Sequence, residues 1–343
     1  MIDARPRRDI VVIGASSGGL EALSKLVAGL PADLPAAVFV VLHLHPHFES
    51  GLAALLSARG PLQASFALHG ESIVPGHIFV APSDAHLQLS DGHLQVVRGP
   101  KENGHRPAVD ALFRTAAAAF GARVIGVVLT GYHDCGTAGL LAIKARGGVA
   151  VVQTPETSAA PAMPSSAIAH VAVDHVAPLE EIASLIAKLV GQPVESDAGD
   201  PRAFDQEGSG ERPAPVSCPA CGGILTETRP AGFPYFTCHV GHTFSLESLT
   251  ATQADELERA LWAAVRALEE SAMMSRRLQA STPAAALQER FQEKERTQTM
   301  QAAMIRDLLL TRDRLSPSDA DALAQEPASP ATRWDARKKR SSM

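Results

Sequence analysis

Short apolar runs alternate with amphipathic stretches along roughly the first 190 residues of the chain. An uninterrupted apolar run is typical of a strand buried on both faces, and apolar residues recurring every three or four positions are typical of a helix with one buried face. The clearest strands are expected at residues 10–13, 37–42, 124–129 and 149–152. Their alternation with helices predicts a doubly wound α/β domain with a mostly parallel sheet.

A different pattern surrounds Asp91-Gly92, where apolar residues alternate with polar ones. Alternation on both sides of an Asp-Gly pair is typical of antiparallel strands joined by a two-residue turn. The apolar positions of this expected β-hairpin are Leu87, Leu89, Leu94 and Val96.

Composition changes abruptly after the α/β region, which we place at residues 8–190. Residues 191–215 are rich in Pro, Gly, Ser and acidic side chains, which predicts a flexible linker. Closely spaced cysteines and histidines then predict a zinc-ribbon-like unit at 216–248. A helical hairpin is expected at 249–312, and a disordered tail at 313–343.

Two apolar stripes support the helical hairpin, with Pro283 between them. The first stripe consists of Leu257, Leu261, Val265, Leu268 and Ala272, and the second of Leu287, Phe291, Met304 and Leu308. Such stripes favour a core between the two helices, with a dimer interface or a docking face as alternatives. The oligomeric state therefore stays open.

The overall composition excludes several classes of protein. The 343 residues carry a net charge of −6, which argues against a nucleic-acid-binding protein, because that role needs a basic face. No apolar run approaches the length of a membrane span, and the N-terminus does not resemble a signal peptide, so no membrane insertion is expected. Four cysteines are too few for a disulfide framework. We expect a cytoplasmic protein.

The turn after the first strand is the strongest candidate for chemistry. Gly14, Gly18 and Gly19 allow a sharp bend that contains Ser16 and Ser17, which suits either a phosphate cradle or an exposed serine nucleophile. A dinucleotide-binding dehydrogenase with such a turn also needs a tyrosine followed four residues later by a lysine. Neither tyrosine of the chain has that lysine, so the nucleophile is favoured.

Three candidate catalytic side chains follow predicted parallel strands, where function gathers in such sheets. Ser16 follows the first strand, His43 the second, and Asp134 with Cys135 the strand at 124–129. A hydroxyl, an imidazole and a carboxylate are the components of a Ser-His-Asp hydrolase. Alternation of His43 with two further histidines also suggests a metal site, but Pro46 interrupts the strand that would align them.

Separated motifs then indicate a family. They are Gly14-Ala15-Ser16-Ser17-Gly18-Gly19, His43 before Pro46, Phe79-Val80-Ala81-Pro82, His105-Arg106-Pro107-Ala108-Val109-Asp110 and Leu129-Thr130-Gly131. Over residues 10–190 the chain resembles the CheB-type chemotaxis protein-glutamate methylesterases. The resemblance implies a Ser16 nucleophile, a His43 general base, oxyanion donors at the backbone N–H groups of Ser17 and Tyr132, and no catalytic cofactor.

The same resemblance implies a substrate and partners. The reaction would be hydrolysis of γ-glutamyl methyl esters, with deamidation of glutamine, on methyl-accepting chemoreceptors or similar methylated proteins, and a receptor methyltransferase is a further expected partner. Only residues 1–9 precede the first strand, so we expect no receiver domain of the kind that often precedes this domain in the family.

The chain departs from the family pattern in the loop after residue 129, because Cys135 occupies the position of the catalytic aspartate. A thiol orients an imidazole poorly, so Asp134, one residue earlier, is the candidate third member. Neighbouring side chains of an extended segment point in opposite directions, however. The alternative function is therefore a weakly active or inactive binding protein in chemosensory signalling.

The cysteine-rich region has the spacing of a zinc site. Cys218 and Cys221 form a Cys-x-x-Cys pair, and Cys238 follows 17 residues later with His239 and His242 nearby. We expect Cys218, Cys221, Cys238 and His242 to bind one zinc ion, with His239 as the alternative fourth ligand. Four protein ligands close the coordination shell, so this zinc would be structural.

Overall fold

The computed structural model describes residues 5–43, 51–90, 92–194 and 212–312. The chain divides into two compact units, Met1–Gln253 and Ala254–Met343, which we describe separately. The first unit contains the α/β domain and the cysteine-rich region. The predicted tail and most of the predicted linker lie outside the described residues. No helix in the described ranges is long and apolar enough to cross a membrane.

A parallel sheet of seven strands forms the centre of the α/β domain, in the order β3-β4-β2-β1-β7-β8-β9. The strands are β1 (Ile10–Ala15), β2 (Ala37–Leu42), β3 (Gln63–Phe66), β4 (His77–Val80), β7 (Val124–Val128), β8 (Val149–Gln153) and β9 (His175–Ala177). Because β1 pairs with β2 on one side and β7 on the other, the loops after these three strands meet at one edge of the sheet.

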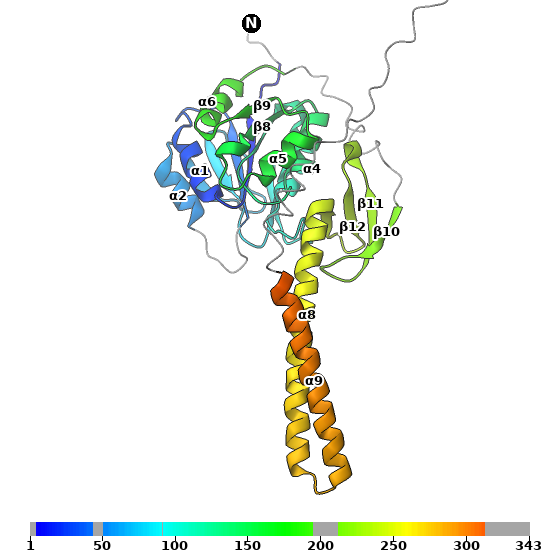
Figure 1. Cartoon of the computed structure of the whole chain (residues 1–343). Helices are drawn as coiled ribbons and strands as arrows, with labels where there is room; N and C mark the ends of the chain where they lie inside the picture. The colour runs from blue at the N-terminus through cyan, green and yellow to red at the C-terminus, as the bar shows by residue number, and fades with distance from the viewer. Residues whose placement is uncertain (1–4, 44–50, 91, 195–211, 313–343) are drawn as a thin grey trace, which may run out of the picture. The chain divides into compact units, whose positions relative to one another are not determined.

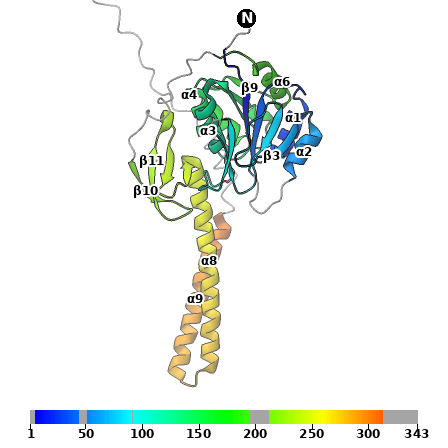
Figure 2. The ribbon, with the colours of Figure 1, turned by 180° about the vertical axis from the view of Figure 1, so that it is seen from behind.

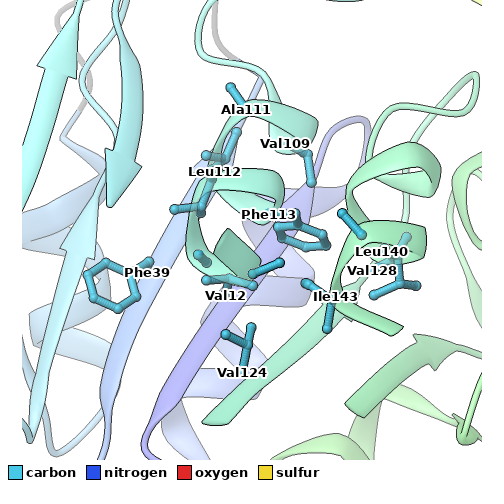
Figure 3. Packing of buried hydrophobic residues seen from close by; sticks show 14 of the residues in the cluster. Val12, Phe39, Val109, Ala111, Leu112, Phe113, Val124, Val128, Leu140 and Ile143 are labelled. Carbon is cyan, nitrogen blue, oxygen red and sulfur yellow. The ribbon is translucent and has the colours of Figure 1, made fainter. Parts of the chain in front are cut away.

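Helices cover both faces of this sheet (Figure 1). One face packs against α1 (Gly19–Ala28), α2 (Leu52–Arg59) and α6 (Leu179–Leu189), and the other against α3 (Val109–Phe120), α4 (Thr137–Ala145) and α5 (Ala162–His170). Phe113 of α3 and Phe39 of β2 are fully buried in the second layer (Figure 3). The predicted doubly wound fold is confirmed.

The predicted β-hairpin is also present, as β5 (His86–Ser90) paired with β6 (His93–Val97). Leu87 and Leu94 are fully buried in the core that contains α3, which explains the alternating pattern of this segment. Three short 3₁₀ helices complete the first unit at Gly121–Arg123, Pro155–Thr157 and Pro230–Gly232.

A second, antiparallel sheet carries the cysteines (Figure 2). Its strands follow one another in chain order: β10 (Arg212–Ser217), β11 (Ile224–Thr228), β12 (Tyr235–Cys238) and β13 (Thr243–Ser245). Leu225, Phe236 and Phe244 form its small core. We call this sheet the ribbon. Its first strand begins at Arg212, four residues before the predicted start of the unit at residue 216.

Two long helices, α8 (Leu246–Ser281) and α9 (Ala285–Arg312), confirm the predicted hairpin. In the second unit, Val265 packs against Ala302 and Leu309. Both predicted stripes were wrong in part, because Leu257 of the first is 49% exposed and, in the second, Leu287, Met304 and Leu308 are 44%, 65% and 57% exposed. Successive side chains of a helix point about 100° apart, so a shift of one or two positions changes which residues face the partner helix. In α9 the buried positions are Ala302 and Leu309.

Candidate active site

The loop after β1 places Ser16 at the edge of the sheet where the three loops meet. Its backbone N–H donates to the carbonyl of Thr130 at 2.9 Å, which ties the turn to the loop after β7. Gly18 has φ 74°, and a Cβ there would lie 2.5 Å from that of Ala159. Only glycine relieves both restraints, so the sequence Gly18-Gly19 is required for the turn that leaves Ser16 partly exposed.

The loop after β2 brings His43 to this serine. The His43 backbone N–H donates to the Ala15 carbonyl at 3.2 Å, and Nδ1 of the ring lies 3.2 Å from Ser16 Oγ. Nδ1 can therefore accept the hydroxyl proton. Burial lowers the pKa of His43 well below its ordinary value, with smaller contributions from His105 and His133, so the imidazole is neutral at neutral pH.

The other ring nitrogen of His43 has no hydrogen-bond partner among the described residues, although Nε2 is buried. A second imidazole packs against the face of this ring: His105 stacks on His43 with ring centroids 3.7 Å apart and planes 12° from parallel. Burial lowers the pKa of His105 to about 4, so this neighbour is neutral as well. In the sequence His105 was recognised only as part of a family motif, with no role assigned to it. His45 and His47 lie outside the described residues.

Asp134 is held away from the serine and histidine pair. Its Oδ1 accepts hydrogen bonds from Ser245 Oγ at 2.7 Å and Ser248 Oγ at 2.9 Å, and the side chain is nearly fully buried. Burial raises the pKa of this carboxyl. The structure therefore brings together Ser16 and His43, and it joins Asp134 to a segment more than a hundred residues further along the chain.

Cys135 is buried in the core of the α/β domain. It is 2% exposed and lies beside Asp110 and Asn103. Burial raises the pKa of the Cys135 thiol well above its ordinary value, so the side chain stays neutral. Neither Cys135 nor Asp134 supplies a carboxylate to His43.

Two loops close to Ser16 each contain a backbone N–H group without a hydrogen bond among the described residues. The Tyr132 loop is fastened at Gly131, whose N–H donates to Ala160 O at 2.9 Å and whose carbonyl accepts from Met163 N at 2.9 Å. A Cβ at Gly131 would lie 2.8 Å from that of Ser16, which shows how closely the loop approaches. Within the described ranges, the N–H groups of Ser17 and Tyr132 make no hydrogen bond. They remain available to an oxyanion.

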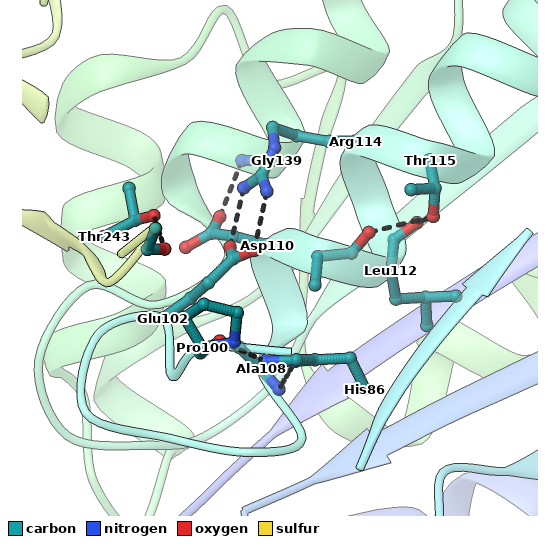
Figure 4. Close-up of polar contacts among 12 residues, drawn as sticks. His86, Pro100, Glu102, Ala108, Asp110, Leu112, Arg114, Thr115, Gly139 and Thr243 are labelled. Carbon is teal, nitrogen blue, oxygen red and sulfur yellow. Dashed lines mark hydrogen bonds and ion pairs between the residues drawn. The ribbon is translucent and has the colours of Figure 1, made fainter. Parts of the chain in front are cut away.

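A fully buried acid, Asp110 of α3, lies beside Gly139 of α4 (Figure 4). Asp110 accepts hydrogen bonds from Gly139 N at 2.6 Å and Asn103 Nδ2 at 2.7 Å, and burial raises its pKa to about 6. Arg114 forms two hydrogen bonds of 2.8 Å with Glu102 nearby. The sequence showed Asp110 only as part of a motif, because its burial depends on the packing of α3 against α4.

Three cysteines and one histidine form a second candidate site, in the ribbon. The donor atoms of Cys218, Cys221, Cys238 and His242 all lie within 4.8 Å of one another, and this cluster could hold a metal ion. The sulfurs of Cys221 and Cys238 are 3.7 Å apart, too far for a disulfide. His239, the alternative ligand, lies against Gly223 outside the cluster.

The α/β domain has a parallel sheet, and a serine hydroxyl lies within hydrogen-bond distance of a histidine nitrogen. These are features of a serine hydrolase. The family model described as CheB methylesterase matches residues 11–186, which is half of the chain, so the chain belongs to that family.

Known proteins show the same likeness. A protein-glutamate methylesterase/protein-glutamine glutaminase of Methanosarcina acetivorans is 36% identical over 192 residues, 54% of each chain. One of Anaeromyxobacter dehalogenans is 40% identical over 191 residues, 54% of this chain and 56% of the other. The chain thus spans about half the length of the curated relatives it matches.

A solved structure agrees. The Thermotoga maritima CheB methylesterase catalytic domain is 34% identical with a TM-score of 0.52, and the match covers 54% of this chain and all of that domain.

Proposed function

We propose that this chain is a protein-glutamate methylesterase that hydrolyses γ-glutamyl methyl esters, and deamidates glutamine, on chemoreceptors or similar methylated proteins. The distance of 3.2 Å between Ser16 Oγ and His43 Nδ1 carries the proposal. Membership in the CheB methylesterase family supports it. The proposed roles are nucleophile for Ser16, general base for His43 and oxyanion donors for the N–H groups of Ser17 and Tyr132.

The chemistry proceeds in two stages. As Ser16 Oγ attacks the ester carbonyl, His43 Nδ1 takes the hydroxyl proton, and the two N–H groups stabilise the oxyanion. His43 returns the proton to the departing methoxide, which leaves as methanol, and an acyl-serine remains. A water molecule, deprotonated by His43, then releases the glutamate side chain and restores Ser16.

Turnover by this pair should be slow. When Nδ1 accepts from Ser16, the ring proton sits on Nε2, which finds no acceptor within the described ranges. In a serine protease, replacing the orienting aspartate by its amide lowers turnover by about 10⁴-fold. Asp134 is not assigned this orienting role, because its carboxylate is bonded to Ser245 and Ser248.

Among the described residues no carboxylate is bonded to His43. This favours a second candidate function, a binding protein that recognises receptor tails or a receptor methyltransferase without efficient turnover. Methanol release from a methylated receptor fragment separates the two. An esterase releases methanol in the native chain and not in Ser16→Ala or His43→Gln, and a fluorophosphonate probe labels it at Ser16. If the native chain matches Ser16→Ala while Cys135→Asp releases methanol, the enzyme proposal fails.

For the ribbon we propose a structural zinc ion bound by Cys218, Cys221, Cys238 and His242. Three thiolates and one imidazole form a tetrahedral donor set that zinc prefers, and four protein ligands leave no position for a catalytic water. Elemental analysis of the purified chain should find one zinc per chain, and Cys238→Ser should lose it. Retention of zinc by Cys238→Ser would contradict this ligand set. A reduced cysteine cluster also fits our proposed cytoplasmic location.

A further inference from the structure

The last strand of the ribbon pairs directly with the loop that carries His105. Thr243, which follows the metal-cluster residue His242, forms a parallel bridge with Glu102. Its carbonyl accepts from Asn103 N at 2.7 Å, and its N–H donates to Lys101 O at 3.3 Å. Figure 4 shows Thr243 close to Glu102. His242 of the metal cluster is thus directly followed in the chain by Thr243, which pairs with this loop.

Asn103 joins the ribbon to the domain core through its side chain. Its Oδ1 accepts from Ser245 N at 2.9 Å and its Nδ2 donates to Asp110 Oδ2 at 2.7 Å, while the residue is 5% exposed. The backbone of Asn103 has φ 51°, a conformation that asparagine adopts more readily than most residues. An aspartate here would lack the donor and would place a second carboxylate against Asp110.

The turn formed by residues 102–105 transmits this contact to the catalytic histidine. Glu102 and His105 exchange two backbone hydrogen bonds of 3.1 and 2.9 Å, which fix His105 relative to the strand partner of Thr243. The His105 ring then lies on His43. Glu102 is further held by Arg114, whose guanidinium also reaches Tyr235 Oη of the ribbon at 3.4 Å.

A second contact reaches the loop of the oxyanion donor. Ser245 precedes α8, accepts from Ser248 N at 3.0 Å as its N-terminal cap, and donates to Asp134. Ser248 donates to the same carboxylate oxygen. Asp134 is two residues from Tyr132, so the segment 243–248 holds both the loop beside the general base and the loop beside the oxyanion.

We infer that the ribbon is a positioning element of the active site, and that a zinc-type cation in the Cys3His cluster holds His43 and Tyr132 in their productive arrangement through Asn103 and Ser245. These two residues touch no substrate and act through their neighbours. This inference rests on the proposed esterase function for its kinetic consequence. Its structural consequence, ordering of the two loops by the metal, is independent of turnover.

Hydrogen exchange of the full chain tests the structural consequence. Removal of the metal by a chelator should increase exchange at residues 102–105 and 131–136, while the amides of β1 and β7 stay protected. Asn103→Ala should increase exchange at 102–105 with the metal bound. The inference is overturned when metal removal increases exchange in the ribbon alone.

Kinetics test the second consequence. In Asn103→Ala and in Ser245→Ala with the metal bound, kcat for methanol release should fall by about 10²-fold while KM changes much less, because misplaced reacting groups affect the transition state more than binding. Ile224→Ala is the ribbon control, since Ile224 of β11 is 72% exposed. Its kcat should match the native chain.

The outcomes distinguish the two proposals. A native chain without Ser16-dependent turnover refutes the esterase function, and the exchange experiment still decides whether the metal orders the loops. An active chain whose kcat is unchanged in both Asn103→Ala and Ser245→Ala refutes the positioning role and leaves the esterase function intact.

Discussion

The loop after β1 and the loop after β7 meet at Ser16, but they are fixed by different means. The loop after β1 is shaped mainly by nearby sequence, namely a buried strand, two glycines and the helix that follows, and Ser16 N adds one hydrogen bond to Thr130 O. The loop after β7 is fixed from outside, because Ser245 and Ser248 bind Asp134. The turn that carries Ser16 thus follows mainly from nearby sequence, whereas the neighbouring loop also depends on contacts with residues 245 and 248.

The largest loss of activity is expected from a change in the loop after β1. Ser16→Ala removes the attacking oxygen and should lower methanol release by about 10³-fold or more, because loss of a nucleophile removes the covalent route. Steady-state methanol production measures this change, and unfolding by heat should be nearly unaffected since Ser16 is partly exposed. Residual activity close to native would place the nucleophile elsewhere.

The approach of the two loops is tested by Gly131→Ala. The added Cβ would lie 2.0 Å from Met163 Sδ and 2.8 Å from Ser16 Cβ, so the loop must move. Such a displacement should lower kcat by about 10²-fold and destabilise the fold by about 1–3 kcal/mol. Gly51→Ala is the control, because nothing lies within 4 Å of its Cβ and its φ of −79° suits alanine. Equal kinetics for the two variants would contradict the close approach.

The burial of His43 should appear in the pH dependence of kcat/KM. The base must be neutral to accept the Ser16 proton, and burial keeps its pKa well below the ordinary value. Activity should consequently persist as the pH falls below about 6.5, the unperturbed pKa of histidine, and decline only at more acidic pH. A profile whose acid limb has its midpoint at 6.5 or higher would indicate a solvated base.

The smallest effect is expected at Asp134. Asp134→Asn retains an Oδ1 that can accept from both serines, and it removes a buried charge, so kcat should stay within about ten-fold of the native value. An aspartate that oriented His43 would instead lose about 10⁴-fold when converted to its amide. Methanol release by Asp134→Asn therefore shows whether Asp134 only anchors its loop to Ser245 and Ser248 or orients His43 as the third member of a catalytic triad.

The sequence alone was sufficient wherever the determining interactions are local. The apolar runs predicted the strands on either side of β1, the glycine turn predicted the exposed Ser16, and Cys-x-x-Cys spacing predicted the four residues of the ribbon cluster. Strands β3, β4 and β9 were not predicted, because three or four residues carry too little periodicity. Their pairing with neighbours in the sheet defines them as strands.

Only the tertiary structure decided what surrounds Ser16 and His43. Cys135 and Asp134 are adjacent in sequence, yet one packs beside Asp110 and the other bonds to residues 245 and 248. The stacking of His105 on His43 likewise depends on how two distant segments pack together. Local patterns determine whether a segment forms a strand, a turn or a helix. Which distant side chain satisfies a buried carboxylate depends on how those segments pack, because a buried polar group must find its hydrogen bonds wherever the fold provides them.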